Sequence, residues 1–341
     1  MSPIHKKITI YDVARRAGAA ISTVSRVLNE SPYVSDQTRK KVEKAIADLE
    51  FYPQVNARKL ASKQPQIIAV AVPTFTTPFY NEVLKGLKDE IQNLDLDFII
   101  FNTGSSHPTE NLRGFLDRGT PDALIIFSIA LDDTLLRRLN KMHVPVILVD
   151  LDYPDFDSIR WNNYLGGRLA GEHLIKCGYR NIGMIRSQKN VHITQAREEG
   201  FKNVLDEHGI TIDDRYVATG ISTKHAGFSE EAGYEAAKIL YERGSLPEAI
   251  YCSNDTQAIG AMCAFRELGI KVPDDVGLIG YDNIKTAKYI GLTTIDQKMT
   301  HVGSMTVKRL AELIYTKEKH PPHIQTIIDP ELIIRETTRN L

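Results

Sequence analysis

From residue 67 onward, short apolar runs alternate with segments whose apolar residues recur at helical spacing, and this alternation leaves few folds open to the chain. The first four apolar runs are expected to be buried parallel strands, at residues 67–72, 98–101, 123–127 and 144–149. The clearest helix between them is 79–94, in which apolar residues repeat at Phe79, Val83, Leu87 and Ile91. Strands that alternate with helices predict a parallel sheet with helices on both faces.

A second series of the same kind follows the first. Its expected strands lie near 181–186, 249–253 and 276–281, and its expected helices lie near 164–177, 194–208, 231–243 and 256–268. Two series predict two doubly wound α/β lobes within residues 66–341. A chain of 341 residues is also too long to fold around one core, which favours several domains.

Residues 1–53 lack this pattern and are typical of a small helical domain. Thr9 favours a helix start, Gly18 ends that helix, and a second helix is expected at 21–28. A third helix opens at Ser35 and carries apolar residues at helical spacing, namely Val42, Ala45, Ile46 and Leu49. The amino-terminal part is therefore predicted to be a three-helix domain.

The second of these helices has an outward face of small polar residues and one arginine. In a helix-turn-helix, the first turn of the second helix contacts base edges in the major groove, which predicts base reading by Ile21, Ser22 and Arg26. Arg26 suits a bidentate contact to guanine, and Ile21 suits a thymine methyl group. The alternative is an ordinary helical hairpin in which Arg26 is only solvated.

Charge is distributed unevenly along the chain. Residues 1–64 hold 12 Lys and Arg against 6 Asp and Glu, and the remaining residues hold 30 against 37. A basic head on an acidic body suits a polyanionic partner for the head alone. Together with the helix pattern, this distribution predicts double-stranded DNA as the partner of the head.

Short motifs through the head form an ordered set. They are Thr-Ile-Tyr-Asp-Val-Ala at 9–14, Thr-Val-Ser-Arg-Val-Leu-Asn at 23–29, Val34-Ser35, Thr38-Arg39, Tyr52-Pro53 and Ala-Arg-Lys-Leu-Ala at 57–61. With this set the chain resembles the LacI/GalR family of bacterial transcription regulators, and the similarity continues through the whole chain. The resemblance implies a helix-turn-helix head, a hinge helix and linker at 54–65, and a periplasmic-binding-protein-like body.

The resemblance also implies DNA contacts outside the second helix. Leu60, beside Arg58 in the hinge segment, matches the family's minor-groove leucine, which pries a base step apart and kinks the duplex. The alternative is that Leu60 packs between domains. The positions that match the family's phosphate contacts are Thr9, Tyr11, Thr23, Ser25, Asn29 and Arg39.

One departure from the family pattern lies just before the second helix. The family usually has Val-Ser there, and this chain has Ala19-Ala20. A serine would cap the helix and reach a phosphate, so Ala20 is expected to cost about 1 kcal/mol of capping free energy and to weaken one backbone contact. The departure concerns operator affinity more than function.

In the body, the resemblance implies three crossings of the chain between the lobes, near Asn162, Thr293 and Ile324. The implied boundaries are 66–161 with 294–323 for lobe 1 and 162–293 with 324–341 for lobe 2. The last helix, 299–317, would return to lobe 1. Periodicity alone predicts two α/β units, and the crossings come from the resemblance.

Ligands of open α/β sheets bind beyond the carboxyl ends of the strands, which here means the cleft between the lobes. Asp150, Asn254 and Asp282 follow expected strands, and Arg197 lies in Ala-Arg-Glu-Glu-Gly-Phe, which resembles the family's effector-gripping Arg-x-x-Gly-Phe. Carboxylate, amide and guanidinium groups bind neighbouring hydroxyls, so the set suits a sugar. Apolar faces for a sugar ring are offered by Phe75, Phe79, Trp161 and Phe228.

Structural roles compete with some of these assignments. Asn254 and the neighbouring Asp255 also suit a helix cap, Phe79 also fits the core stripe of its helix, and Trp161 also suits core packing. Ligand contact is favoured for Arg197 and Asp282 because their positions match a family motif.

Several other classes of protein are disfavoured. The chain lacks G-x-G-x-x-G, G-x-x-x-x-G-K-[ST], H-E-x-x-H and G-x-S-x-G, and its ten histidines show no metal-ligand spacing, so no enzyme activity, cofactor or metal is expected. Cys177, Cys252 and Cys263 are scattered and are expected to be reduced and buried, in a cytosolic protein. No apolar run reaches roughly 18 residues, and the start lacks the apolar stretch of a secretion signal, so neither a membrane span nor export is expected.

Together, these patterns predict a cytoplasmic, nucleoid-associated repressor that reads an imperfect palindrome as a homodimer, with operator affinity set by a small sugar-like effector. The lack of leucine heptads after the last strand favours a dimer over a tetramer. Two alternatives are an exported sugar-binding protein, which needs a signal peptide and no basic head, and a sugar-processing enzyme with an accessory DNA-binding head. The sequence leaves open which effector binds and whether it induces or co-represses.

Overall fold

The computed structural model describes residues 8–28, 31–51, 67–94, 96–104, 106–188, 192–244, 246–316, 318 and 321–340. The chain divides into two compact units, residues 1–66 and 67–341. The first unit contains the helical head and the second contains the body. The expected hinge segment, 54–65, lies outside the described residues, and so do Asn29, Arg58 and Leu60.

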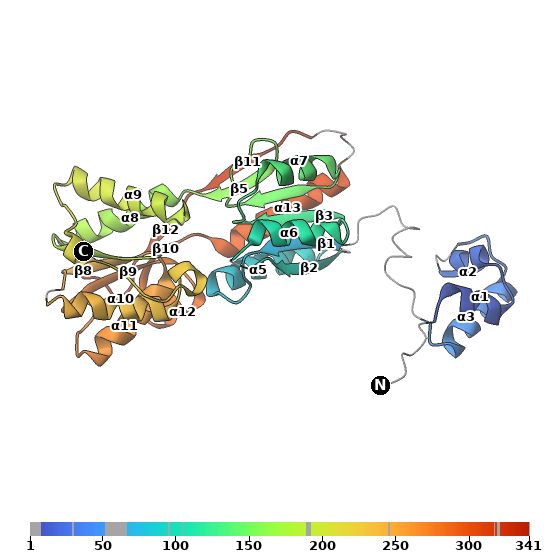
Figure 1. Ribbon diagram of the computed structural model, residues 1–341, viewed down its shortest axis with the longest axis horizontal. Coiled ribbons are helices and arrows are strands. Elements are labelled where there is room, and N and C mark those ends of the chain that lie inside the picture. The colour runs from blue at the N-terminus through green and yellow to red at the C-terminus, as the bar shows by residue number, and fades with distance from the viewer. Residues whose placement is uncertain are drawn as a thin grey trace. The chain divides into compact units, whose positions relative to one another are not determined.

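Three helices build the head, drawn in blue in Figure 1: α1 (Ile10–Ala17), α2 (Ile21–Leu28) and α3 (Asp36–Asp48). At the start of α1 the Asp12 carboxylate accepts from both the backbone N–H and the hydroxyl of Thr9. Gly18 ends α1 in the left-handed conformation, with φ at 61°, which glycine adopts without a Cβ clash. The buried side chains of the head share one core: Val13, Ala14, Val24, Val27, Val42, Ala45 and Phe51. The expected helices are confirmed.

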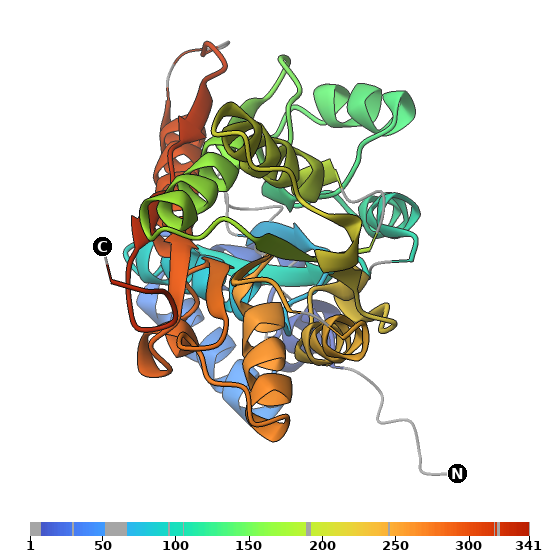
Figure 2. The same cartoon turned by 90° about the vertical axis from the view of Figure 1, so that its left-hand side faces the viewer.

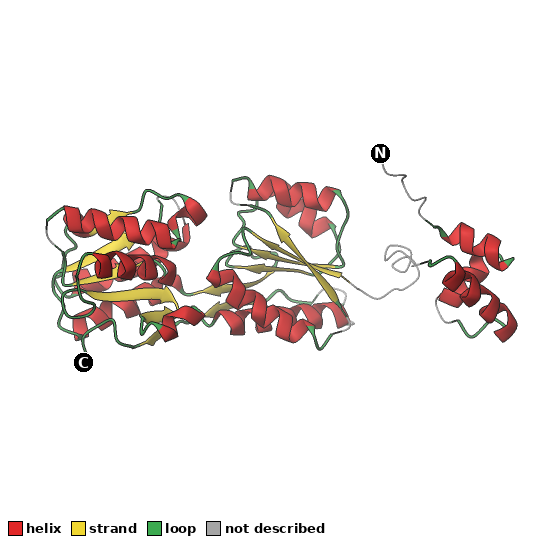
Figure 3. Ribbon diagram, turned by 90° about the horizontal axis from the view of Figure 1, so that it is seen from below, coloured by secondary structure: helices red, strands yellow, loops and turns green. Residues whose placement is uncertain are grey.

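Lobe 1 contains a six-stranded sheet in the order β11-β5-β4-β3-β1-β2, in which all neighbouring strands are parallel. Its strands are β1 (Ile67–Val72), β2 (Asp97–Asn102), β3 (Ala123–Phe127), β4 (Val146–Val149), β5 (Asp157–Trp161) and β11 (Gln325–Ile328). Its helices are α5 (Pro78–Ile91), α6 (Pro108–Asp117), α7 (Asp133–Lys141) and α13 (Met299–Tyr315). Helices cover both faces of this sheet (Figure 3), so successive residues of β1 belong to different hydrophobic cores. Val70 shares a core with Val83 of α5, and Ala71 shares the other core with Leu112 of α6.

Lobe 2 repeats the design with the strand order β12-β10-β9-β8-β6-β7, antiparallel where β12 meets β10. Its strands are β6 (Ile182–Arg186), β7 (Val217–Thr219), β8 (Ala249–Cys252), β9 (Gly277–Asp282), β10 (Thr293–Asp296) and β12 (Glu331–Ile333). Its helical segments are α8 (Asn163–Lys176), α9 (His192–Glu207), η1 (Asp214–Tyr216), η2 (Lys224–Gly227), α10 (Glu230–Glu242), α11 (Asp255–Glu267) and α12 (Lys285–Tyr289). Helices α8 and α9 cover one face of the sheet, and α10 and α11 cover the other (Figure 1).

The two predicted α/β units are confirmed, with corrections at the sheet edges. The expected strand at 98–101 exists as β2, but it is an edge strand, and Ile99 is 47% exposed where burial was expected. The sequence patterns do not predict β5, β7, β10, β11 or β12. These strands are short or mix polar with apolar residues, as in Asp-Ser-Ile-Arg-Trp of β5, so their pairing depends on distant neighbours and not on local pattern.

The chain crosses between the lobes three times, but two crossings differ from the expectation. The first lies at Asn162, between β5 and α8, as expected. The second follows Asp296, a few residues beyond Thr293, because β10 pairs with β9 in lobe 2. The third follows Ile328, a few residues beyond Ile324, because β11 pairs with β5 in lobe 1. Long-range strand pairing therefore displaces both boundaries toward the carboxyl terminus.

The last helix returns to lobe 1, as the family resemblance implied, and glycines let it approach α5 closely. A Cβ at Gly86 would lie 1.9 Å from the Thr300 carbonyl oxygen, and one at Gly303 would lie 2.2 Å from the Val83 carbonyl oxygen. Both distances are far below van der Waals contact. The backbones of α5 and α13 therefore pack together only because these two positions carry no side chain.

The segment after β12 is fastened to lobe 2, beside the point where Figure 2 marks the carboxyl terminus. The Leu278 N–H donates to the Thr337 carbonyl, and the Thr337 hydroxyl donates back to the Leu278 carbonyl, both at 2.7 Å. The next residue, Thr338, has its hydroxyl 2.8 Å from Nε2 of His173 on α8. Burial, followed by the charge of Lys176, lowers the pKa of His173, so this histidine is neutral where it holds the segment.

We expect His173 to make the stability of the body depend on pH. The unfolded chain binds a proton at His173 below about pH 6.5, the ordinary histidine pKa, whereas the folded chain binds it only at a lower pH. The free energy of unfolding therefore has its highest value above the ordinary histidine pKa and falls as the pH drops below it. His173→Gln should flatten this part of the profile, measured as the urea midpoint from about pH 7 down to about pH 5. An unchanged slope in the variant would show that another group carries the dependence.

The cysteines and the helix lengths test two further expectations. Cys177 and Cys252 are buried, as expected, whereas Cys263 is only half-buried, and all three are free thiols. Across the described ranges, no helix combines the length and the apolar character that crossing a bilayer requires.

Candidate functional site

In the head, α2 presents a polar surface. Ile21, Ser22 and Arg26 are exposed, Ile21 at 42%, whereas Val24 and Val27 are buried in the head core. The three exposed residues are those predicted to read bases, and the structure places all of them on the outer side of one helix. This placement agrees with the prediction, in which short side chains allow a close approach to base edges and the guanidinium of Arg26 contacts a guanine.

The predicted phosphate contacts are spread around this helix. Thr9 and Tyr11 are exposed at the start of α1, and Thr23 and Ser25 are half-buried on α2. Arg39 also has a structural role, because its Nη2 donates to the Ser31 carbonyl at 2.6 Å and ties the loop after α2 to α3.

Sequence reasoning missed one prominent side chain of the head. Tyr33, in the loop between α2 and α3, is 87% exposed. The available signal was its position in a turn beside Pro32, where an aromatic ring finds no core partner. Its exposure on the head makes it a further candidate for DNA contact.

The start of α2 lacks a side-chain cap, as the sequence indicated. The Ala20 carbonyl accepts from the N–H groups of Thr23 and Val24 at 2.9 and 3.1 Å, but alanine has no side-chain acceptor for the free N–H groups. Ala20→Ser should therefore stabilise the head by about 1 kcal/mol. The measurement is the amide hydrogen exchange of α2 in the full chain. Ala47→Ser, at an exposed position inside α3, is the control and should bring no gain.

In the body, a cavity of about 250 Å³ lies between the two lobes. Its lining comes from strand ends, from the loops that follow them and from helices of both lobes. Lobe 1 contributes Pro73, Thr74, Thr77, Phe79, Tyr80, Ser128, Asp150 and Trp161, and lobe 2 contributes Arg197, His225, Ala226, Phe228, Asn254, Thr256 and Asp282. Polar groups and aromatic rings thus face one space, as the carboxyl ends of parallel strands predict.

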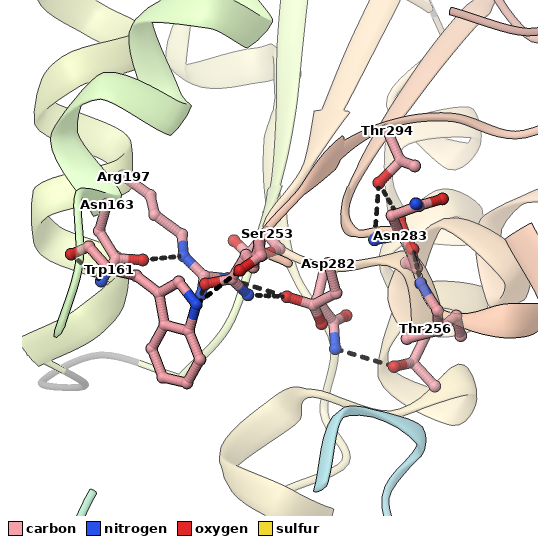
Figure 4. A network of polar contacts seen from close by, with 12 residues as sticks. Trp161, Asn163, Arg197, Ser253, Thr256, Asp282, Asn283 and Thr294 are labelled. Atoms are coloured by element: carbon pink, nitrogen blue, oxygen red, sulfur yellow. Dashed lines mark hydrogen bonds and ion pairs between the residues drawn. The ribbon is translucent and has the colours of Figure 1, made fainter. Parts of the chain in front are cut away.

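Arg197 of α9 is the central cation of the cavity (Figure 4). It is 5% exposed, and its guanidinium stacks on the Tyr281 ring, 3.8 Å from the ring centroid. Its Nε donates to Asn163 Oδ1 at 2.8 Å, Nη1 to the Ser253 carbonyl at 3.0 Å, and Nη2 to Gln297 Oε1 at 3.2 Å. These bonds use three of the five guanidinium N–H groups, which fixes the plane of the fork and leaves donors for a ligand.

Asp282 is the anion that faces Arg197. Its Oδ1 lies 3.6 Å from Arg197 Nη1 and accepts from Gln297 Nε2 at 2.5 Å. Burial raises the pKa of Asp282 to about 7, against the lowering effect of Arg197 and Gln297. The carboxyl group is therefore poised between its two protonation states near neutral pH, a property common at functional sites.

Asp150 closes β4 on the opposite side of the cavity. It accepts from the Ser128 hydroxyl at 3.1 Å, and its backbone is left-handed, with φ at 62°. Asp282 and Asn283 at the end of β9 also have positive φ, at 117° and 55°. Left-handed backbone in residues other than glycine is strained, and of these three residues Asp150 and Asp282 line the cavity.

The other predicted ligand residues differ in their placement. Phe79 and Phe228 line the cavity, but Phe75 is 46% exposed and is not among the lining residues, because the loop after β1 turns its ring to solvent. Asn254 also lines the cavity, although its Oδ1 caps α11 by accepting from Gln257 N and its Nδ2 donates to Thr256. The helix-cap alternative for Asn254 is therefore confirmed.

The core-packing role considered for Trp161 is confirmed. The side chain is buried and packs edge-on against Phe79, and its indole N–H donates to the Gln297 carbonyl at 2.7 Å. It also lines the cavity. The only tryptophan of the chain is thus a core residue and a cavity wall at once.

Sequence reasoning missed several of the lining residues, namely Pro73, Thr74, Thr77, Tyr80, Ser128, His225, Ala226 and Thr256. Pro73 and Thr74 follow β1 and Ser128 follows β3, so the strand-end rule could have found these three. His225 and Ala226 lie in η2, where both have left-handed φ, at 50° and 56°. No local signal predicts that conformation, which is held from outside by Gln188 N donating to the Ala226 carbonyl. Among the residues that the structure describes, no group of His, Cys, Asp and Glu is arranged to hold a metal ion.

The chain is similar to known proteins along its whole length. Residues 9–54 match the description "Bacterial regulatory proteins, lacI family", and residues 172–338 match "Periplasmic binding protein-like domain". The HTH-type transcriptional repressor PurR of Photobacterium profundum is 32% identical over 339 residues, which cover 98% of this chain and 99% of that protein. The chain belongs to the lacI family of bacterial regulatory proteins. This lacI-family protein is a DNA-binding transcriptional regulator, as its sequence predicts.

Solved structures of the lacI family share the fold described above. The lac repressor dimer bound to operator and the anti-inducer ONPF matches with a TM-score of 0.77 and 28% identity, covering 98% of this chain and 100% of that one. A LacI family regulator from Enterococcus faecium with bound ribose matches with a TM-score of 0.70 and 29% identity, covering 81% of this chain and 100% of that one. The head and the two α/β lobes of this lacI-family protein therefore follow the family's architecture.

Proposed function

We propose that this lacI-family protein is a repressor that binds its operator as a homodimer, and that a small sugar-like effector between the lobes sets its operator affinity. The observation that carries the proposal is the cavity, in which charged and aromatic side chains of both lobes face one space. A ligand there contacts both lobes at once, so its binding free energy depends on how the lobes are arranged. By linkage, an effector that weakens operator binding is bound more weakly by the DNA complex, by the same factor.

The cavity chemistry supports a sugar as the effector. Asp150 and Asp282 accept from hydroxyls, Arg197 donates to them, and Phe79 and Phe228 offer apolar faces to a ring. We assign ligand contact to these five residues and a supporting role to Asn254, whose side chain is engaged within the protein. The ribose bound by the Enterococcus faecium regulator is in keeping with this class of ligand.

For the head, we assign base reading to Ile21, Ser22 and Arg26, and phosphate contact to Thr9, Tyr11, Thr23, Ser25, Asn29 and Arg39. The exposure of α2 supports the first set. We place a hinge at residues 54–65, with Leu60 and Arg58 in the minor groove at the operator centre, where the two hinges of a dimer meet. Residues 1–53 then form the DNA-binding domain and residues 66–341 the effector domain.

Leu60→Ala should reduce the bend of the operator. Two leucines wedged into one base step kink the duplex, at a cost of roughly a few kcal/mol that extra contacts offset, and alanine is too short to wedge. The bend angle is measured by circular-permutation gel shift or by energy transfer between the DNA ends. Arg58→Ala should weaken binding with less effect on the bend. An unchanged bend angle in Leu60→Ala would remove the intercalation role.

Other functions are less well supported. We infer that the protein is not an enzyme, because its relatives are repressors. We place it in the cytoplasm with the nucleoid, where its DNA partner lies. The alternative of a sugar-processing enzyme with an accessory DNA-binding head is tested by incubating the protein with the ligand that it binds best. Turnover of that ligand would contradict the regulator assignment.

The deciding experiment selects bound DNA from fragmented genomic DNA and then measures the affinity of the selected fragments at low salt. We expect an imperfect palindrome to bind far more tightly than a scrambled duplex, and equal affinities would overturn the proposal. A thermal-shift screen of ribose and other sugars identifies the effector, since a ligand at 100 times its Kd stabilises the protein by about 2.7 kcal/mol. The effector must then change operator affinity.

A further inference from the structure

The three crossings between the lobes are tied to one another by side chains. Trp161, before the first crossing, donates its indole N–H to the Gln297 carbonyl in the second, at 2.7 Å. Asn162 Nδ2 in the first donates to Asp329 Oδ1 in the third, at 2.8 Å. Lys298 Nζ in the second lies 2.6 Å from Glu331 Oε1, just after the third. The crossings therefore form one connected unit, and a shift in one affects the others.

Gln297 extends this unit to the cavity. It is 0% exposed and is not among the cavity-lining residues, yet its side chain contacts both buried charges of the cavity. Its Nε2 donates to Asp282 Oδ1 at 2.5 Å, and its Oε1 accepts from Arg197 Nη2 at 3.2 Å. Figure 4 shows this network between Arg197, Trp161 and Asp282. One residue thus connects the central ion pair to the backbone that links the lobes.

We propose that Gln297 is a positioning residue that transmits changes at the Arg197–Asp282 pair to the crossings. The inference rests on the proposed effector site. An amide supplies one acceptor and one donor group in fixed geometry, which match a guanidinium and a carboxylate together. When a ligand draws either partner away, one end of a fully buried amide loses its hydrogen bond, and an unpaired polar group there is costly. The second crossing then shifts to satisfy the amide, and the indole of Trp161 moves with it.

The proposal can be tested without a ligand, because protonation of Asp282 perturbs the ion pair and the fluorescence of Trp161 reports the response. Proton binding at Asp282 changes the ion pair without any effector, since burial raises the pKa of Asp282 to about 7. Trp161 is the only tryptophan of the chain, so its emission reports the surroundings of one indole, which include the Gln297 carbonyl. The groups that face Asp282 from the neighbouring elements are Arg197, His225, Asp255, Asp150, Tyr251 and Tyr281.

The experiment follows Trp161 emission in the full-length protein from about pH 5 to about pH 9, a range centred on the Asp282 transition. We expect a transition near pH 7 in the unmodified protein, its loss in Asp282→Asn, and its persistence in His225→Gln. Gln297→Met keeps the length of the side chain and the backbone carbonyl but removes both side-chain hydrogen bonds. The emission transition should therefore be lost in Gln297→Met, although Asp282 still titrates.

Gln257→Met is the matched control. Gln257 is also 0% exposed and donates two side-chain hydrogen bonds, to the carbonyls of Arg186 and Gly227, away from the crossings. Its variant should keep the transition. If Gln297→Met retains the full transition, or if Gln257→Met loses it equally, the proposal is wrong.

If Gln297→Met does not fold, the same emission titration is carried out with Gln297→Glu. A carboxylate beside Asp282 should raise the pH midpoint of the Trp161 emission transition, and an unchanged midpoint would overturn the proposal. None of these measurements uses DNA or a sugar, so a failure of the proposed function, seen as absent operator or sugar binding, is distinguished from a failure of this inference.

Discussion

Arg197→Met is expected to abolish the effector response and to destabilise the body. The substitution removes the cation of a buried pair and three hydrogen bonds, and it leaves Asp282 without its partner. Breaking a buried ion pair by removing one member costs about 3–5 kcal/mol. We expect a loss of this size in the free energy of urea unfolding, and operator affinity that no longer changes when the sugar found by the thermal-shift screen is added.

Operator affinity without effector should be nearly unchanged in Arg197→Met, measured below the unfolding transition. Arg186→Met is the matched control, because Arg186 also pairs with a carboxylate of α9, Glu198, at 2.7 Å, but does not line the cavity. The Arg186→Met variant should have a somewhat lower free energy of unfolding and should keep the effector response. A variant of Arg197 that lost operator affinity and kept the response would place the effector site elsewhere.

Arg26→Ala is expected to relax base preference at one position of each operator half-site. A bidentate contact from a guanidinium to guanine discriminates against other bases by about 1–3 kcal/mol, and alanine cannot replace it. The measurement compares the affinities of the protein and the variant for operators that carry each base pair at that position. The affinity for the preferred base should fall, and the affinities for the other bases should fall less.

Arg15→Ala provides the comparison for Arg26→Ala. Arg15 is a highly exposed arginine of α1, so its loss removes charge from the head without removing a group from the outer side of α2. It should weaken binding evenly across all operator variants and reduce the salt dependence of binding. Even weakening by Arg26→Ala as well would show that Arg26 contacts phosphates and does not read bases.

Much of the head could be predicted from its sequence because the determinants are local. Thr9 with Asp12, Gly18 and Ser35 set helix ends through contacts within a few residues, and the inner and outer sides of α2 follow from helical spacing. The same holds for the strand-end residues Asp150 and Asp282, since a residue that follows a parallel strand lies at the binding edge whatever the details of the fold.

The strand-end rule failed where a loop decided the direction of a side chain. Phe75 and Ser128 both follow strands of lobe 1, yet Ser128 lines the cavity and Phe75 faces solvent. The backbone of Ser128 is left-handed, with φ at 47°, which aims its hydroxyl at Asp150. Neither the sequence pattern nor the residue type indicates such a conformation.

The sequence alone determined two α/β units, a helix-turn-helix head and most of the polar residues at the strand ends, because helix caps, periodicity and strand-end position are local properties of the chain. Only the tertiary structure decided which distant residues meet. Gln297 contacts Arg197 and Trp161 across 100 and 136 residues of chain, and the pairing of β10 with β9 and of β11 with β5 sets where the crossings lie. These contacts depend on long-range strand pairing and on the direction of side chains, and local sequence patterns predict neither.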